Sequence, residues 1–220
     1  MSVFKKTSQG YEEISLHNKY KGAEIILCGT GPSLWKINTD ELKSTEKLVF
    51  GLNNSFKLVD LDFWMAFDAP TEFDGQIWQS DAVKFYNFTH ATEVLKYNPR
   101  HIFFYKHLAP DSQGRWPVYG VKLRGPHINF LFEGDTFPMT LQMLYWLGFK
   151  KVFLAGCDFG GNSKLSKMSS IYNENTQHKN LSHGLEILKK AHIKSGIEFV
   201  SCTPNSPIND FLPYKPIGKI

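Results

Sequence analysis

AEIILCGTGPS, residues 23–33, joins an apolar run to a turn of small residues. The run predicts a buried strand, because a short apolar stretch that ends at glycine is typical of the interior of a sheet. The turn can offer backbone N–H groups and a hydroxyl to a phosphate at the start of a helix. It also fits a plain turn that caps a helix, so both interpretations stay open. The residues concerned are Gly29, Thr30, Gly31, Pro32 and Ser33.

The same turn lacks the marks of two familiar phosphate loops. The pattern G-x-G-x-x-G misses its third glycine, and Pro32 has no N–H to offer. No G-K-[ST] follows, which excludes a P-loop. Asn53 and Asn54 end the next apolar run, where a dinucleotide site has an acidic residue for the ribose. A nicotinamide dinucleotide is therefore a weak fit. The two asparagines suit either a turn or hydrogen bonds to a sugar or base.

Apolar runs alternate with helical patterns along the rest of the chain. Residues 136–148 predict a helix, with Pro138 in its first turn and Gly148 after its end. An amphipathic pattern predicts another helix over 183–196, and the polar stretch at about 160–182 predicts a loop or small lid. Further strands are expected within residues 47–54, 62–70, 82–88, 101–107, 150–161 and 197–206. This order predicts an α/β fold, a mostly parallel sheet with helices on both faces, in one domain over residues 1–220.

Small or polar residues follow nearly every predicted strand. Ligands bind outside the carboxyl ends of parallel strands, near the switch in strand order, so these residues are candidates for substrate binding. Turns favour the same residue types, which is the competing interpretation. Besides the glycine turn and the two asparagines, the candidates are Asp68, Asp158, Phe159, Pro204, Asn205 and Ser206.

The composition describes an ordinary globular protein. Its net charge of +4 comes mainly from scattered lysines, which indicates a solvated surface rather than a nucleic-acid groove. Cys28, Cys157 and Cys202 lie in or beside apolar runs and form no C-x-x-C pair, a pattern typical of reduced, buried thiols. Neither a secretory segment nor an apolar run of about 18 residues occurs, so we expect a cytoplasmic protein without a transmembrane segment. Peripheral membrane contact and a homo-oligomer stay open.

The acidic residues and histidines do not form a metal-binding pattern. Neither Asp68 nor Asp158 belongs to a D-x-D pair, so each lacks the further oxygen ligands that a divalent cation needs. His178 and His183 are spaced so that they do not share one helix face, which argues against zinc. A lone histidine is most often a surface or structural residue. His178, however, lies in the polar stretch before a helix, where a general base could reach a pocket at the sheet edge.

Six segments, taken in order, resemble the bacterial sialyltransferases of glycosyltransferase family 42. In the N-terminal half they are LCGTGPSL, LVFGLNNSF and FWMAFDAP. In the C-terminal half they are MLYWLGFKKVFLAGCDF, QHKNLSHGLEILKK and FVSCTPNSPINDFL. The resemblance covers about residues 23–212 and extends to motility accessory factors, hydroxymethylpterin pyrophosphokinase-like proteins and short phage-encoded proteins. The Asn-Asn pair and the compact Pro-rich C-terminus are most similar to the phage-encoded group.

The resemblance implies a Rossmann-like sheet with a small lid, which binds a sugar linked to cytidine monophosphate (CMP) without a metal. Thr30 and Asp68 stand where the family has asparagines, and Asn53 matches a family asparagine. The serine that opens a helix in the family falls at Asp135 or Thr136, and the glycine after it is Phe137 here.

The resemblance also implies catalytic residues. The general base of the family corresponds best to His178 in HKN, with His183 as the second choice. The family's Asp-Phe-Tyr, whose tyrosine stabilises the leaving phosphate, has become Asp158-Phe159-Gly160. Tyr172 is the tyrosine within the expected lid that could replace it.

Taken together, these observations predict a metal-independent, sialyltransferase-like glycosyltransferase that transfers a sugar from a CMP-activated donor to an acceptor hydroxyl. Its expected partners are the sugar nucleotide and a glycan or other hydroxyl acceptor, with no nucleic acid and no further cofactor. One alternative is a hydroxymethylpterin pyrophosphokinase-like enzyme, which needs a metal–ATP site and acidic clusters that the sequence does not show. The other is a non-catalytic protein that binds a nucleotide or sugar nucleotide, which the missing tyrosine suggests.

Overall fold

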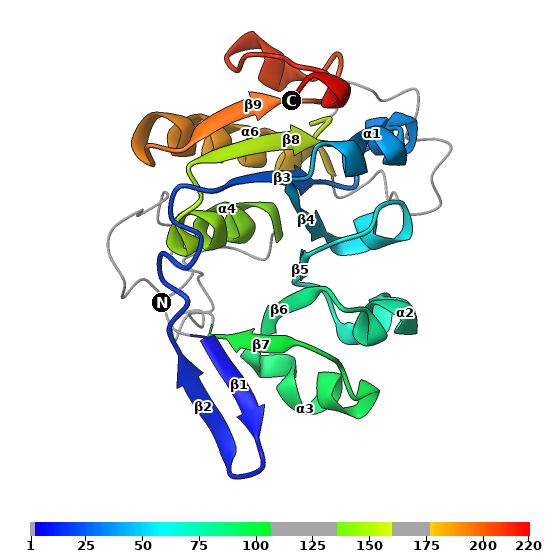
Figure 1. Ribbon diagram of the computed structural model, residues 1–220, viewed down its shortest axis with the longest axis vertical. Coiled ribbons are helices and arrows are strands. Elements are labelled where there is room, and N and C mark those ends of the chain that lie inside the picture. Colours follow the sequence, from blue (N-terminus) through cyan, green and yellow to red (C-terminus); the bar gives the residue numbers. More distant parts are fainter. Residues whose placement is uncertain (1–2, 107–135, 160–176) are drawn as a thin grey trace.

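The computed structural model describes residues 3–106, 136–159 and 177–220, and the side chains of the last range from residue 184 onward. The described residues form a nine-stranded sheet in the order β2-β1-β7-β6-β5-β4-β3-β8-β9 (Figure 1). Strands β3 to β9 are all parallel, whereas β1 and β2 form an antiparallel hairpin on β7. The strands are β1 Val3–Thr7, β2 Gly10–Ile14, β3 Glu24–Cys28, β4 Leu48–Leu52, β5 Phe63–Met65, β6 Val83–Asn87, β7 Ile102–Tyr105, β8 Lys151–Ala155 and β9 Glu198–Ser201.

Helices cover both faces of this sheet. In β3, Ile25 and Leu27 belong to a core shared with two long helices, while Ile26 and Cys28 point into a second core on the opposite face. This alternation follows from the two-residue period of a strand. The described helices are α1 Thr39–Ser44, α2 Gly75–Gln79, α3 Ala91–Val94, α4 Thr136–Leu147 and α6 Gln177–Lys194. The α4 and α6 helices pack on the first face, and the shorter helices lie on the second.

The helix ends follow local sequence signals. Asn38 caps α1 by accepting a hydrogen bond from the Asp40 N–H at 2.9 Å. Gly148 follows α4 with φ of +91°, a left-handed conformation that glycine adopts without strain. The α6 helix begins at Gln177, six residues before the start that its amphipathic pattern predicts. Residues 177–182 of the expected loop are therefore helical, and residues 160–176 lie outside the described part of the chain.

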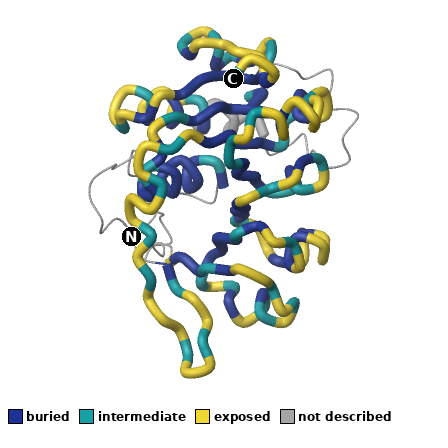
Figure 2. The backbone as a smooth tube through the Cα atoms, in the orientation of Figure 1, coloured by how far each residue is buried: buried dark blue, intermediate teal, exposed yellow. Residues whose placement is uncertain are grey.

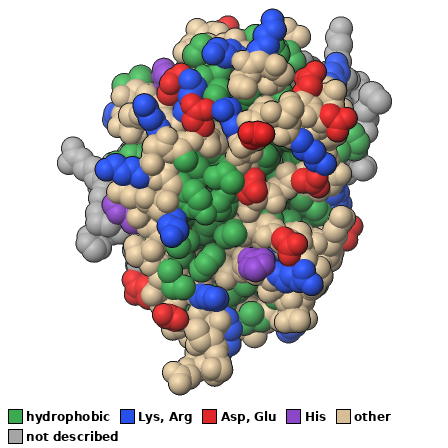
Figure 3. Space-filling model, in the orientation of Figure 1, with side chains coloured by type: hydrophobic (Ala, Val, Ile, Leu, Met, Phe, Trp, Pro, Cys, Tyr) green, Lys and Arg blue, Asp and Glu red, His purple; other side chains and the backbone are tan. Residues whose placement is uncertain are grey.

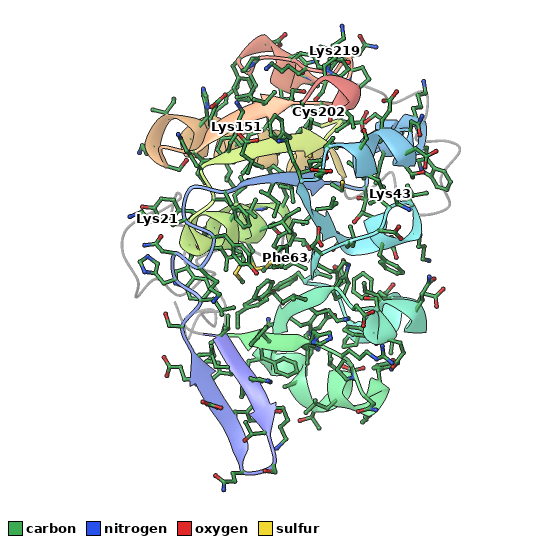
Figure 4. All side chains as sticks on the ribbon, in the orientation of Figure 1. Lys21, Lys43, Phe63, Lys151, Cys202 and Lys219 are labelled. Atoms are coloured by element: carbon green, nitrogen blue, oxygen red, sulfur yellow. The ribbon has the colours of Figure 1, made fainter. Side chains whose placement is uncertain are left out.

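Aromatic side chains fill the middle of the sheet. The Phe63 ring stacks on Phe50 of the neighbouring strand at 5.7 Å between centroids, and on Phe85 of the other neighbour at 6.4 Å. Figure 4 shows Phe63 at the centre of the molecule. The high aromatic content of the chain therefore serves packing, as its placement within apolar runs indicates.

The N-terminal hairpin is an element that the sequence reasoning missed. It projects from one end of the molecule, and its tube is mostly exposed or intermediate in Figure 2. Phe4 anchors it through a ring contact with Phe88 at 5.5 Å. The pattern VFKKTSQGYEEI carries the signal of two short strands joined by Ser8 and Gln9, with Gly10 opening the second strand at a φ of +131°.

Candidate functional site at the carboxyl edge of the sheet

The order of the parallel strands in the sheet reverses at β3. Strands β4 to β7 follow on one side of it, and β8 and β9 follow on the other. The crevice between the carboxyl ends of β3 and β8 is therefore the switch point where ligands bind in such sheets. The glycine turn leaves β3 at this point, and Gly156, Cys157 and Asp158 leave β8 beside it.

The glycine turn continues alongside β8 after β3 has ended. The Gly29 N–H donates to the Ala155 carbonyl, and the Gly31 N–H donates to the Gly156 carbonyl, both at 2.8 Å. A Cβ on Gly29 would lie 2.6 Å from the Gly156 oxygen, closer than such atoms approach in proteins. Glycine is therefore needed here because the glycine turn and the end of β8 pack against each other without room for a side chain.

Asp158, which lies three residues after β8, forms hydrogen bonds to the end of the glycine turn. Its Oδ2 accepts hydrogen bonds from the Ser33 N–H at 3.1 Å and from the Ser33 hydroxyl at 2.8 Å. Both residues are almost fully buried, so the carboxylate takes the place of a cap for the short 3-10 helix Pro32–Lys36.

These contacts change which groups the turn offers to a ligand. The N–H groups of Gly29, Gly31 and Ser33 and the Ser33 hydroxyl are already used within the protein. This differs from the expectation that the whole turn presents donors to a phosphate. Half-buried Thr30 is the exception, because its N–H and hydroxyl make no hydrogen bond within the described ranges.

Asn53 and Thr136 meet at the same edge. Asn53 directly follows β4 and lies two residues beyond Gly51, the residue paired with Cys28 of β3. The buried Thr136 hydroxyl, on the first residue of α4, is 2.9 Å from Asn53 Oδ1. Two candidates that are distant in the sequence are thus brought together. The Oδ1 of neighbouring Asn54 is buried and has no hydrogen-bond partner among the described residues.

The segment after β9 supports the end of β8. The Cys157 N–H donates to the Thr203 hydroxyl at 3.0 Å, and the Ser206 hydroxyl donates to the Cys157 carbonyl at 2.8 Å. Ser206 is buried and therefore has a structural role, whereas Asn205 is exposed in a left-handed turn with φ of +57°. Pro204 precedes Asn205 and is partly exposed.

Asp68 lies at the carboxyl end of β5, on the far side of β4 from the switch point. Its side chain is exposed, and its backbone carbonyl accepts a hydrogen bond from the Tyr86 hydroxyl. Local desolvation and the nearby Glu72 carboxylate raise the pKa of Asp68 above its usual range. The structure shows no contact between Asp68 and the cluster formed by Asn53 and Thr136 within the described ranges.

Phe159 connects this edge to α6. Its backbone is left-handed, with φ of +45°, and its ring contacts Phe137 of α4 at 5.2 Å. A Cβ on Gly184 of α6 would lie 3.1 Å from the Phe159 ring, so the helix passes close to the end of β8. His178 belongs to the first turn of α6, but its side chain and that of His183 are outside the described part, as is all of Tyr172.

Two other features lie away from this edge. A groove of about 640 Å³ between α1 and residues 56–62 reaches Leu48 and Val49, which begin β4, and so opens near the opposite edge of the sheet. Lys43 and Asp60 in its wall pair at 2.9 Å. On the face in Figure 3, acidic and basic side chains alternate around a central hydrophobic area. Charges of both signs line the groove, so the carboxyl edge remains the candidate site.

Within the described ranges, no group of three or more His, Cys, Asp or Glu side chains could hold a metal ion. No described helix is long and apolar enough to cross a membrane.

The fold has known counterparts among sialyltransferases. The chain is similar to the sialyltransferase CstII from Campylobacter jejuni solved with the substrate analogue cytidine-5'-monophosphate, with a TM-score of 0.52 and 16% identity over 91% of this chain and 88% of that one. It is also similar to CST-II solved with a trisaccharide acceptor and CMP, with a TM-score of 0.51 and 18% identity over 90% and 88% of the two chains. No family model and no curated protein sequence matches it. The likeness establishes the fold, and the predicted α/β class is confirmed.

Proposed function

We propose that the chain is a sialyltransferase-like glycosyltransferase that uses a CMP-activated sugar. One observation carries the proposal: Asn53 and Thr136 are hydrogen-bonded beside the switch point, in a fold similar to that of enzymes that were solved with CMP. The Asn53 carboxamide and the Thr30 hydroxyl suit the phosphate and sugar of one nucleotide. A mononucleotide also needs less close approach of the backbone than a dinucleotide does, which agrees with the missing third glycine.

The proposed reaction is a direct displacement at the anomeric carbon of the donor sugar. A bond forms from the acceptor oxygen to that carbon while the bond from the carbon to the phosphate oxygen breaks. The proton of the acceptor hydroxyl goes to a general base, and CMP leaves with the electron pair of the broken bond. Fixed donors at the carboxyl edge would stabilise the departing phosphate, and no metal is invoked.

His178 is the proposed base, with His183 as the second choice. The position of α6 supports this choice, because Gly184 of that helix lies against Phe159, which directly follows Asp158. His178 is six residues before Gly184, or about 9 Å along the helix axis. Tyr172 is proposed to support the leaving phosphate in place of the family tyrosine.

Calorimetric titration tests the nucleotide. We expect CMP and CMP-sialic acid to bind, and ATP with magnesium to bind more weakly or not at all. Absence of binding by both cytidine compounds would refute the proposal, and tight binding of ATP with magnesium would favour the pyrophosphokinase-like alternative. If the cytidine compounds bind, measuring CMP release from CMP-sialic acid with and without an oligosaccharide acceptor separates an enzyme from a binding protein.

Substitution of the histidines tests the base. His178→Ala should lower turnover by about 100-fold or more while CMP affinity changes little, because a general base acts in the chemical step. His183→Ala is the matched comparison on the same helix. A loss confined to His183→Ala would transfer the role to that residue, and full activity in both variants would exclude both.

A further inference from the structure

The backbone conformation of Asn53 and two hydrogen bonds, one from β5 and one from α4, hold this residue in one position. Its own backbone is left-handed, with φ of +45°. The indole N–H of Trp64, a fully buried residue of β5, donates to the Asn53 carbonyl at 2.7 Å. The Thr136 hydroxyl on α4 contacts its Oδ1 at 2.9 Å. Main chain and side chain are therefore fixed independently.

This arrangement is not explained by the turn alone. A non-glycine residue at positive φ costs free energy, although asparagine tolerates it better than most, and glycine would adopt it freely. Asn18, Asn98 and Asn205 also have positive φ, so the two hydrogen bonds of Asn53, and not its conformation alone, carry the inference. The carboxamide of Asn53 is the group that glycine would remove.

The contact with Thr136 also determines which way the carboxamide points. Thr136 is 4% exposed, so its hydroxyl hydrogen needs an acceptor. Asn53 Oδ1, at 2.9 Å, is the acceptor that the described residues provide. With Oδ1 engaged in this way, the two N–H groups on Nδ2 are left for a ligand.

We propose that Thr136 is a positioning residue, which donates to Asn53 Oδ1 and so presents Nδ2 as a hydrogen-bond donor to the bound nucleotide. The site then selects ligand groups that accept hydrogen bonds, such as the oxygens of the sugar nucleotide. This rests on the proposed function and deepens it, because it gives Thr136 a role through Asn53 rather than a ligand contact of its own.

A double-mutant cycle tests the proposal with CMP as the probe. Wild type, Thr136→Val, Asn53→Ala and the double variant are titrated with CMP by calorimetry, and Thr136→Ser is added because it keeps the hydroxyl. Thr136→Val should weaken CMP about tenfold, and Thr136→Ser should restore most of the affinity. In the Asn53→Ala background, Thr136→Val should have little further effect, because the group that it positions is gone.

Independent losses in the two single variants would overturn the proposal, because Thr136 would then act without Asn53. Unchanged CMP affinity in Thr136→Val would do the same. Thermal unfolding of the same four proteins without ligand measures the Thr136–Asn53 hydrogen bond by itself. The unfolding midpoint of the double variant should differ by about 2 °C from the value expected by adding the shifts of the two single variants. If wild type binds no CMP, the proposed function fails and the nucleotide part of this inference fails with it, whereas an additive unfolding cycle would refute the positioning contact itself.

Discussion

At the scale of single residues, Gly31 shows how tightly the candidate site is built. A Cβ at this position would lie 2.1 Å from Asp158 Oδ2 and 2.6 Å from the Gly156 oxygen. Neither neighbour can move away easily, because one is a buried carboxylate bonded to Ser33 and the other is backbone. The backbone of Gly31 itself is ordinary, with φ of −66°, so glycine is required here for space rather than for conformation.

We expect Gly31→Ala to lower the free energy of unfolding by about 2–4 kcal/mol, because overpacking must displace Asp158 or the end of β8. Urea denaturation measures the effect. Gly75→Ala is the matched control, since a Cβ there meets nothing within 4 Å and the residue is in α2. It should be neutral or slightly stabilising. Equal stability of the two variants would show that the turn is not packed as described.

The sequence predicts the glycine turn but not its neighbours. A turn after a strand is visible in the spacing of Gly29 and Gly31. Their partners on β8 lie more than a hundred residues later, and no local pattern connects them. The same holds for Asn53 and Thr136, each a candidate by its own position, whose hydrogen bond depends on how α4 packs across the sheet. The roles of these residues in binding stay predictions.

At the scale of elements, a cysteine lies at or just beyond the carboxyl end of three neighbouring strands. Cys28 ends β3, Cys157 lies two residues after β8, and Cys202 directly follows β9, where Figure 4 labels it. All three thiols are free and buried, as their apolar surroundings in the sequence predict. Burial raises the pKa of Cys28 and of Cys202 to about 12, and it raises the pKa of Cys157 as well.

These shifts predict how stability depends on pH. Between the ordinary thiol pKa near 9 and the folded values near 12, the unfolded chain loses the protons while the folded chain keeps them. The folded state then binds more protons, so the free energy of unfolding falls as pH rises through this window, by up to about 1.4 kcal/mol per pH unit for each thiol.

Urea denaturation of wild type and Cys28→Ala between pH 8 and pH 11 checks this prediction. The variant should lose less stability across the range than wild type does, whatever its stability at pH 8. Parallel curves would show that Cys28 ionises equally in both states.

The sequence located the parallel strands and the two long helices better than it located the short elements. A buried parallel strand can be recognised in the sequence as an apolar run, as is the case for β3, β4 and β8. The β5 strand has three residues within a longer apolar run, because Ala66 and Phe67 leave the ladder. The hairpin was missed because its exposed strands carry charges rather than apolar residues.

At the scale of the whole molecule, the last residues protect one edge of the sheet. The Ser201 N–H of β9 donates to the Pro213 carbonyl at 2.9 Å, and the Lys215 N–H donates to the Ser201 carbonyl at 2.8 Å. Ile217 then packs into the core with 5% of its surface exposed. The tail therefore takes the place of a further strand and covers backbone groups that would otherwise be open to other chains.

Ending the chain at Leu212 should lower the free energy of unfolding by about 2–4 kcal/mol, from two hydrogen bonds and one buried isoleucine. Light scattering should also show more association, because the β9 edge is uncovered. Ile217→Ala should cause part of the same loss of stability but should not increase association, because the tail still covers β9. Ile193→Ala is the control, since Ile193 is 78% exposed and should change little. Unaltered stability after truncation would contradict this role of the tail.

The hydrogen bonds from Ser33 to Asp158 join residues that are 125 positions apart. During synthesis the ribosome makes the glycine turn long before it makes its cap, and the turn has no partner until β8 has emerged and paired with β3. The candidate site is therefore one of the last parts of the protein to be completed, because its turn and its cap come from opposite halves of the chain. A finished glycine turn thus reports that the C-terminal half has been made and has docked.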